Sequence, residues 1–343
     1  MKPISFRLLA RLAFAIVLLA AATVSGFTAE DFYKGKQIRL IAGFPAGNDY
    51  DLGARLLVKY LGKYIPGQPS IIVQNMPQAS SVAAANYLYT QAPNDGTVLG
   101  TFSRNIVNDA LTGQPNLTID PRRFIWLGAT SRPARLCVRS ATAPVKTPAD
   151  LFTHEFIVGA AGATSSLAIL PTVINKVLGT KFKIVEGYQG MGDTVLAIER
   201  GELQGECASL QQFRVHEQLF RDGKLFFLLR AEEAPIAEVP DVPSIFDYAK
   251  TDEQRQLMRF VFSSTEFGRP YVFPPEVPKD RVDIMRKAIA AAANDPQLVA
   301  EAASIKMDMT YTPPERLEQL VAKLYETPPR LIETIKAILP NEK

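Results

Sequence analysis

The sequence is poor in the side chains that usually build catalytic and metal sites. Its 343 residues include two histidines, His154 and His216, and two cysteines. It has no H-E-x-x-H or C-x-x-C metal spacing, no G-x-S-x-G nucleophile elbow, and no G-x-G-x-x-G or G-K-[ST] phosphate loop. A histidine-based nucleophilic triad therefore has few candidates. We expect no metal, no organic cofactor and no catalytic activity, and surface or structural positions for both histidines.

Net charge and long apolar runs are also scarce once the first residues are set aside. Residues 1–29 contain three bases, an apolar run at 12–24 and no acid, which is typical of a secretory signal peptide. A membrane anchor is the alternative, although the run is short for a bilayer, and cleavage after Gly26 or Ala29 is left open. The chain has 38 Lys and Arg against 35 Asp and Glu, so removal of the three bases leaves 35 of each sign. This balance gives no reason to expect nucleic acid or an anionic membrane as partner.

The two cysteines, Cys137 and Cys207, lie in segments with strand-like patterns, RLCVR at 135–139 and GECAS at 205–209. In an oxidising compartment such a pair can form a disulfide, whereas two buried thiols are the alternative. Export of the protein favours the disulfide.

Strand and helix patterns alternate along the rest of the chain. The clearest unit is a buried strand at 38–42, a small-residue loop at 43–50 and an amphipathic helix that follows. Such alternation predicts an α/β fold, with parallel or mixed sheets covered by helices on both faces. About 315 residues remain after position 29, more than one hydrophobic core usually organises, so two lobes are expected.

Three small-residue loops each follow a predicted strand and precede a predicted helix, at residues 43–51, 159–166 and 187–193. In α/β sheets such loops gather at the carboxyl ends of the strands, where ligands bind. The backbone N–H groups at a helix start favour an anion. Loops that merely connect elements are the alternative for any one of them. Together they favour binding of a small anion over catalysis.

A series of short motifs follows in order along residues 29–339. They are GFPAG at 43–47 with YD at 50–51 and AR at 54–55, VQNMP at 73–77, ANYL at 85–88, APNDGT at 92–97, GYQG at 187–190, GEL at 201–203 and PDVP at 240–243. In order and spacing they resemble the solute-binding receptors of tripartite tricarboxylate transporters, also called the Bug family. Each motif is short, and their number and order make the resemblance specific.

The resemblance implies a two-lobed, type II-like clamshell of the periplasmic-binding-protein kind, each lobe a mixed sheet flanked by helices. It implies a signal peptide at 1–29, one lobe at 30–134 plus 266–343, and the other at 135–265. In function it implies a monomeric periplasmic receptor that captures an organic carboxylate by lobe closure and delivers it to membrane permease subunits. The solute could be a di- or tricarboxylate or an aromatic acid. The sequence names neither the solute nor the number of carboxylates bound.

The resemblance places ligand contacts on the three small-residue loops. They are Gly47, Asn48, Asp49 and Tyr50 on the first loop, Ala163, Thr164, Ser165 and Ser166 on the second, and Tyr188, Gly190 and Asp193 on the third. Ser103 and Arg104 follow the strand expected at 98–102, so they also point to the cleft end of the sheet. Arg104 is a candidate partner for a second carboxylate, with a solvated arginine as the alternative.

Two acidic residues of the first loop need separate roles. Asp51 is expected to brace the loop and the helix, because a carboxylate aimed at an anionic ligand would repel it. Asp49 either turns away from the ligand or binds a hydroxyl or amine on it. The chain also departs from the family pattern at Ala46-Gly47, usually a glycine pair, and at 78–81 (QASS), usually glycine-rich. These departures leave the ligand's identity open rather than the fold.

Two other functions compete with a transport receptor. One is a secreted hydrolase that uses Ser165 or Ser166 with His154 or His216. The other is a pair of receptor lobes whose closure is read by a signalling sensor protein.

Overall fold

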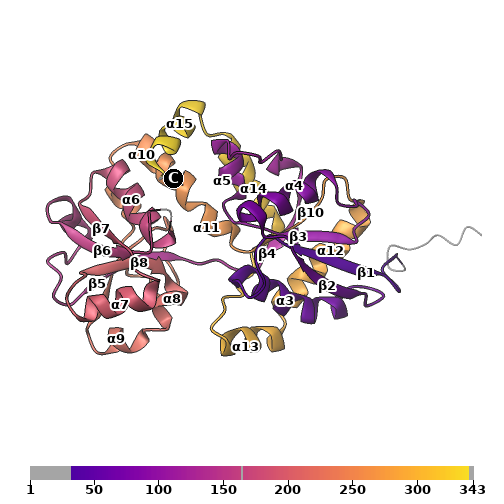
Figure 1. Ribbon diagram of the computed structural model, residues 1–343, viewed down its shortest axis with the longest axis horizontal. Coiled ribbons are helices and arrows are strands. Elements are labelled where there is room, and N and C mark those ends of the chain that lie inside the picture. The colour runs from indigo at the N-terminus through magenta and orange to yellow at the C-terminus, as the bar shows by residue number, and fades with distance from the viewer. Residues whose placement is uncertain (1–31, 164, 340–343) are drawn as a thin grey trace, which may run out of the picture.

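The computed structural model describes residues 32–163 and 165–339. The predicted signal peptide at 1–29 lies outside the described residues. Among the described helices, none is long and apolar enough to cross a membrane. Figure 1 shows two lobes side by side, each built around a five-stranded sheet flanked by helices. The two-lobed α/β architecture predicted from the sequence is confirmed.

The first sheet is mixed, with strand order β2-β1-β3-β10-β4. Its strands are β1 (Gln37–Ala42), β2 (Ser70–Asn75), β3 (Val98–Thr101), β4 (Ile125–Ala129) and β10 (Pro270–Phe273). β1 pairs in parallel with β2 and β3, whereas β10 enters from the other lobe and pairs antiparallel with β3 and β4. The loops after β1 and β3 therefore leave the same edge of the sheet.

Successive side chains of β1 enter two different hydrophobic clusters, one of which continues into the second lobe. Leu40 shares a buried cluster with Leu57 and Ile289, whereas Ile41 shares another with Leu88 and Trp126. Burial on both faces explains the near-continuous apolar run of this strand. The helices of this lobe are α3 (Asp49–Leu61), α4 (Val82–Thr90), α5 (Ile106–Thr112), α12 (Lys279–Ala293), α13 (Pro296–Ser304), α14 (Pro314–Tyr325) and α15 (Pro329–Ile338).

The second sheet repeats this plan, with strand order β7-β6-β8-β5-β9. Its strands are β5 (Arg135–Ser140), β6 (Phe156–Ala160), β7 (Phe182–Glu186), β8 (Gly205–Ser209) and β9 (Leu225–Arg230). β6 pairs in parallel with β7 and β8, whereas β5 is antiparallel to β8 and β9. The start of β5 therefore lies at the same edge as the carboxyl ends of β6, β7 and β8.

The helices of the second lobe are α6 (Ser166–Leu178), α7 (Met191–Glu199), α8 (Leu210–Arg214), α9 (Glu217–Arg221), α10 (Asp252–Phe262) and α11 (Ser264–Phe267). Short 3-10 turns complete the fold at η1 (Gly62–Tyr64), η2 (Gln78–Ser81), η3 (Pro121–Arg123), η4 (Pro148–Phe152) and η5 (Ile245–Tyr248).

Two chain segments, called here the crossing segments, pass between the sheets at residues 130–134 and 263–269 (Figure 1). Helix α15 also joins the lobes, because it contacts α5 on one side and α6 and α10 on the other. The first sheet uses residues 37–129 and 270–273, and the second uses 135–230. The lobe boundaries themselves, 30–134 plus 266–343 and 135–265, stay predictions.

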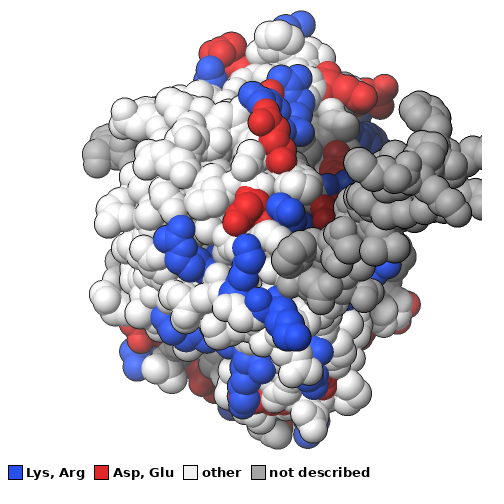
Figure 2. Space-filling model, turned by 90° about the vertical axis from the view of Figure 1, so that its right-hand side faces the viewer, with Lys and Arg blue, Asp and Glu red and all other residues white. Residues whose placement is uncertain are grey.

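The outer face of the first lobe carries basic side chains with acidic ones among them (Figure 2). Several of these charges form ion pairs between elements, such as Lys59 of α3 with Glu301 of α13 at 2.7 Å. Exposed pairs of this kind contribute less than about 1 kcal/mol each. The pair between Lys59 and Glu301 helps to hold α13 against α3.

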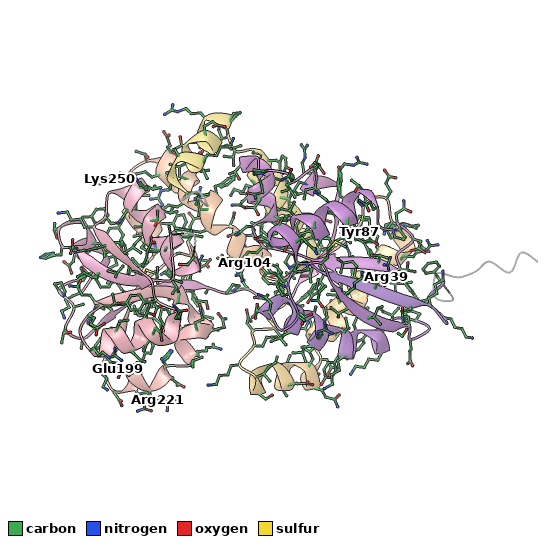
Figure 3. All side chains as sticks on the ribbon, in the orientation of Figure 1. Arg39, Tyr87, Arg104, Glu199, Arg221 and Lys250 are labelled. Carbon is green, nitrogen blue, oxygen red and sulfur yellow. A yellow bond between two sulfur atoms is a disulfide. The ribbon has the colours of Figure 1, made fainter. Side chains whose placement is uncertain are left out.

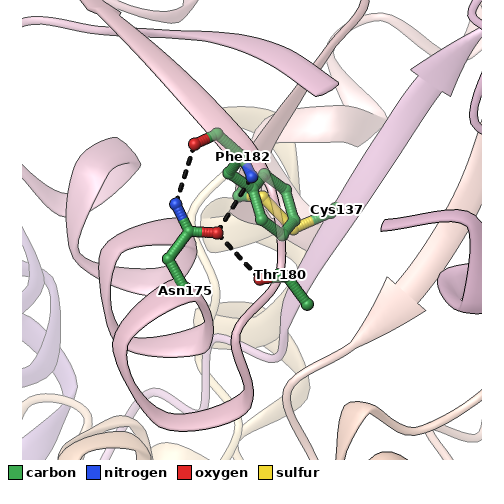
Figure 4. Close-up of a disulfide and its surroundings, with 5 residues drawn as sticks. Cys137, Asn175, Thr180 and Phe182 are labelled. Carbon is green, nitrogen blue, oxygen red and sulfur yellow. Dashed lines mark hydrogen bonds between the residues drawn. A yellow bond between two sulfur atoms is a disulfide. The ribbon is translucent and has the colours of Figure 1, made fainter. Parts of the chain in front are cut away.

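The register of β5 against β8 places Cys137 directly opposite Cys207. The two form a disulfide, with an S–S distance of 1.93 Å and a Cα–Cα distance of 4.0 Å. Both residues are buried, beneath the end of α6 and the start of β7 (Figure 4). There Asn175 holds helix to strand, because its amide donates to Phe182 O at 2.7 Å and its oxygen accepts from Phe182 N at 2.9 Å.

Loss of this disulfide is expected to destabilise the second lobe. The bond closes a loop of 70 residues, and cross-links of this kind typically stabilise a protein by about 2–4 kcal/mol. The Cys137→Ala/Cys207→Ala variant should therefore unfold at a lower temperature than the wild type, as measured by circular dichroism. Reductant should lower the Tm of the wild type towards that of the variant and leave the variant unchanged. Equal Tm values for the two proteins without reductant would contradict the prediction.

Strand β8 also contains a buried glutamate, Glu206, immediately before Cys207 of the disulfide. The side chain of Glu206 is fully buried, and neither carboxyl oxygen has a hydrogen-bond partner within the described chain. Burial raises the pKa of Glu206 to about 7, and the neighbouring Thr194 hydroxyl offsets only part of this shift. That hydroxyl donates instead to Met191 O at 3.0 Å. Glu206 therefore keeps its proton close to neutral pH in the folded protein.

A rise in pH from 5 to 8 is expected to remove stability through Glu206. Its pKa in the unfolded chain is near 4.5, so the folded protein binds the proton more tightly, and this stability is lost as the pH rises through about 7. Each pKa unit corresponds to about 1.4 kcal/mol. Glu206→Gln should therefore raise the Tm at pH 8 and change it little at pH 5.

The exposed Glu199 of α7, changed to Gln, is the control for this experiment. A Tm difference between wild type and Glu206→Gln that is the same at both pH values would show that ionisation of Glu206 is not responsible.

Candidate functional site

The first loop is closed by Asp51, the third residue of α3. One carboxylate oxygen accepts from Gly47 N at 2.8 Å and from Arg55 Nε at 2.9 Å, and the other accepts from Asn75 Nδ2 at 2.7 Å. Burial acts to raise the pKa of Asp51, but these hydrogen bonds outweigh it and hold the pKa below its usual value. The prediction that Asp51 braces the loop and the helix is confirmed.

Asp49, the first residue of α3, forms an ion pair with Arg269 from the second crossing segment. Both Asp49 oxygens lie 2.9 Å from Arg269 Nη1. The Arg269 side chain is 2% exposed and that of Asp49 is 55% exposed. Arg269 Nη2 donates to Thr130 O at 3.1 Å and also to Asp308 O. This geometry favours the interpretation in which the Asp49 carboxylate turns away from the ligand.

Tyr50 is almost fully buried and stacks on Phe44, with ring centroids 4.2 Å apart. Its hydroxyl accepts from both the backbone N and the Nε of Arg104, each at 3.1 Å, and donates to Gly268 O at 3.3 Å. Tyr50 thus holds Arg104 in place against a crossing segment. This contact joins two predicted site residues that are 54 positions apart.

The crossing segments touch where Tyr50 meets Gly268. Gly268 has φ of +50°, and a Cβ there would lie 1.7 Å from Ser131 O. Any larger residue would therefore push the crossing segments apart. Glycine is required here by the close approach of backbone to backbone.

Ser103 takes part in a turn, and its role as a ligand contact stays a prediction. Its N–H donates to Ser81 Oγ at 3.2 Å, and its own Oγ accepts from Asn105 N at 3.2 Å. Ser81 Oγ in turn donates to Gly43 O at 2.9 Å. Ala79, Ser80 and Ser81 have φ of 50°, 51° and 81°, so this stretch keeps a glycine-like backbone without glycine.

The third loop has the same closure as the first. Asp193 Oδ2 accepts from Gln189 N at 3.2 Å, four residues earlier, as Asp51 does from Gly47 N. Tyr188 N donates to Ala160 O at 3.2 Å, which ties this loop to the end of β6. Gly190 has φ of 158° and precedes α7. The loop aspartates of both lobes therefore accept hydrogen bonds from their own loops.

In the second loop, Ala163 and Ser165 flank Thr164, which lies outside the described residues. Ser165 stands before the first residue of α6, and its buried Oγ has no hydrogen-bond partner within the described chain. His154 Nδ1 lies 2.9 Å from Thr153 Oγ1 instead. The described residues therefore contain no hydrogen-bonded Ser165–histidine pair. Nor do they contain a group of three or more His, Cys, Asp or Glu side chains that could hold a metal ion.

A pocket of about 310 Å³ lies between the lobes. Its walls include Arg104 and Asn108 from the first lobe, and Arg135, Ile169, Ser209 and Gln212 from the second. β3 and β8 end at this pocket, and each lies beside a strand that connects to a crossing segment. The pocket is thus at the end of the cleft nearest the crossing segments. Figure 3 shows Arg104 between the two lobes.

Among the predicted site residues that the structure describes, Arg104 lines this pocket. The Tyr50 hydroxyl holds it in place by accepting a hydrogen bond from its Nε. Residues 47–49 and 188–193 lie outside the lining. Arg135 also lines the pocket, whereas its sequence pattern predicts only that it belongs to a strand. Burial lowers its pKa to about 10, the positive charge of Arg104 contributes, and Glu232 acts in the opposite direction.

A second pocket, of about 660 Å³, lies near the crossing segments, with Arg132, Glu232 and Glu266 in its walls. Its charged residues are largely paired. Arg259 lies 2.6 Å from Glu233, and Arg316 lies 2.6 Å from Glu266. Burial raises the pKa of Glu232 to about 7, against the lowering effect of Arg132. Its four basic side chains are balanced by four glutamates, whereas the first pocket has two arginines and one aspartate in its walls.

Replacement of Asp49 by Asn is expected to destabilise the protein by about 1–3 kcal/mol, because it leaves the buried guanidinium of Arg269 without a counter-charge. Urea unfolding measures the loss. Asp252→Asn is the matched control, since Asp252 also stands first in a helix, α10, but has no buried partner among the described residues. Equal losses in the two variants would assign the effect to the helix start rather than to Arg269.

Comparison with known proteins found no matching family model. Among curated proteins, the chain is 23% identical over 333 residues to the "UPF0065 protein in gbd 5′ region" of Cupriavidus necator, covering 95% of each. This similarity extends along nearly the full length of both proteins.

Among solved structures, the chain is similar to a TctC solute-binding protein from Polaromonas (19% identity, TM-score 0.67), with 89% of this chain and 98% of that one covered. It is also similar to the periplasmic binding protein BugD (16%, TM-score 0.56, coverage 89% and 98%). A third is R. palustris Rpa4515 with adipate (17%, TM-score 0.56, coverage 89% and 97%). The predicted resemblance is therefore confirmed, and the chain has the fold of the TctC and Bug solute-binding proteins.

Proposed function

We propose that the protein is a periplasmic receptor that binds a small organic carboxylate between its lobes and delivers it to membrane permease subunits. The observation that carries this proposal is the pocket of about 310 Å³ whose walls come from both lobes. A pocket at the carboxyl ends of β3 and β8 is where ligands bind in open α/β sheets. A solute there contacts both lobes at once.

The chemistry of the pocket supports an acidic solute. Two arginines line it, with the amide and hydroxyl groups of Asn108, Gln212 and Ser209. The similar protein Rpa4515 was solved with adipate, a dicarboxylate. The Asn108 amide already donates to Phe260 O and the Ser209 hydroxyl to Gln212 Oε1, and Asp109 is also in the wall. Arg104 and the amide N–H groups of Gln212 are the groups that a carboxylate there would meet as donors.

Lobe closure is the mechanism we propose. Because a solute in the pocket touches residues of both lobes, it has more contacts when the lobes are closed and shifts the population towards that state. The two crossing segments connect the sheets and approach each other closely at Gly268 and Ser131, so we take them as the hinge. The closed form would then be the one that the permease recognises.

The protein is expected to gain thermal stability when it binds its solute. Binding to the native state alone stabilises by RT ln(1 + [L]/Kd), which is about 2.7 kcal/mol at a ligand concentration 100 times Kd. Calorimetry and thermal shift with adipate, malate, citrate, benzoate, hexanoate and glutamate test this. We expect at least one acid to raise the Tm, and its uncharged amide to give no shift.

Failure of every acid in this set to bind would count against a carboxylate receptor. Delivery has its own test, because cells that lack the protein should take up the bound acid more slowly. Normal uptake in such cells would show that the protein is not needed for transport of the acid that it binds.

A further inference from the structure

The two pockets lie on opposite sides of the crossing segments. In the first crossing segment, Arg132 lines the second pocket and the next residue, Pro133, lines the first. In the second crossing segment, Ser263 lines the second pocket and Ser264 lines the first. Adjacent side chains of each segment thus point to different pockets. The crossing segments therefore form a wall that both pockets share.

The strand order of the sheets places the pockets in the same way. In the second sheet β5 lies between β8 and β9. Ser209 at the end of β8 lines the first pocket, and Ala231, which follows β9, lines the second. In the first sheet β10 lies between β3, after which Arg104 lines the first pocket, and β4, against which α14 of the second pocket packs. The strands next to the crossing segments, β5 and β10, thus have one pocket on each side.

Helix α15 also connects the lobes, and it runs from one pocket to the other. Pro328, just before α15, lines the second pocket, and Leu339, just after it, lines the first. The helix contacts α5 of the first lobe and both α6 and α10 of the second. Its Leu331 and Ile335 side chains are buried in a hydrophobic cluster that includes residues of both lobes. Because these connections lie between the pockets, a rotation of the lobes about them narrows one pocket as it widens the other.

Both lobes contribute charged side chains to the second pocket. The hydrogen bond from Arg259 is the main cause that holds the pKa of Glu233 below its usual value, and the charge of Lys323 adds to this effect. Glu233 follows β9 of the second lobe and Lys323 belongs to α14 of the first, so their attraction acts between the lobes. Within the described chain, Glu233 is paired with Arg259 and not directly with Lys323. Widening of the pocket would separate these charges further, so their attraction favours its narrow form.

We propose that the second pocket is the rear side of the hinge: it widens when the lobes close on the first pocket, and a group that fills it favours the closed form. This inference rests on the proposed function, because it takes lobe closure around the first pocket as the binding step. The apparent Kd of a solute equals its intrinsic Kd divided by the fraction of molecules that are already closed. A side chain that fills the second pocket raises this fraction. Binding then becomes tighter although no contact with the solute changes.

Gln319→Trp tests the inference, because Gln319 is exposed and lines the second pocket from α14. The matched control is Ala322→Trp, at an exposed position of the same helix outside the lining. Calorimetry measures the Kd of the tightest-binding acid of the set above. We expect Gln319→Trp to lower this Kd by about threefold or more, because a larger fraction of the protein is closed, and Ala322→Trp to leave it unchanged.

A second readout needs no solute. Spin labels on Ser70→Cys of β2 and Lys183→Cys of β7 report the distance between the lobes, because these are the edge strands farthest from the crossing segments. Without any acid, electron-spin-resonance distances should shift to shorter values in Gln319→Trp and stay as in the wild type in Ala322→Trp.

Lys323→Gln tests the same inference without adding bulk. Lys323 is exposed, so its replacement should leave the fold intact. Loss of its attraction to Glu233 should ease widening of the second pocket and lower Kd, by less than Gln319→Trp does. High NaCl should remove the difference from the wild type, because it screens the same attraction. Lys287→Gln, exposed on α12 and outside both linings, is the control.

The outcomes distinguish the two proposals. Unchanged distances and Kd in Gln319→Trp and Lys323→Gln would overturn the hinge inference while the receptor function stands, and so would a higher Kd in Gln319→Trp. If Gln319→Trp does not fold, Lys323→Gln alone decides in the same way. If no acid binds the wild type but Gln319→Trp still shortens the distances, the receptor function is overturned and the hinge remains.

Discussion

The buried guanidinium of Arg269 is the constraint on which the candidate site depends. A buried charge is costly unless it is paired and hydrogen-bonded. Both Nη atoms of Arg269 are bound, to the Asp49 carboxylate, Thr130 O and Asp308 O, and its Nε has no partner in the described chain. These partners come from the start of α3, from the first crossing segment and from the chain after α13. Gly53 provides the space for the Arg269 side chain, because a Cβ at this position would lie 2.7 Å from Arg269 Nε. One side chain thus fixes the first loop against both crossing segments.

Tyr50, the residue after Asp49, extends this restraint to the pocket. Tyr50 lies between the crossing segment at Gly268 and the guanidinium of Arg104. The first loop therefore acts on the pocket by positioning Arg104. This explains how a loop can be rich in family motifs and yet lie largely outside the pocket lining: its residues secure the geometry of a neighbouring loop.

Local patterns predicted the sheets and the brace at Asp51, because strand alternation and like-charge repulsion act over a few residues. Such local patterns did not predict the contacts between residues far apart in the sequence. Asp49 and Arg269 are 220 positions apart, and no periodicity connects them. Arg135 reaches the pocket only because β5 runs antiparallel to β8, and strand direction does not follow from a five-residue pattern. The available signal was a charged residue, Arg135, at one end of a predicted strand. The sequence did not show at which edge of the sheet that end lies.

The disulfide secures the wall that the second lobe provides to the pocket. Arg135 stands opposite Ser209, and two residues along each strand Cys137 is bonded to Cys207. The pocket wall formed by β5 and β8 is therefore cross-linked close to its edge, while Tyr50 restrains Arg104 across the boundary. Holding both walls of the pocket in place before binding lowers the entropy lost when a solute arrives. A solute that contacts both walls of this pocket would therefore favour the closed state of the lobes.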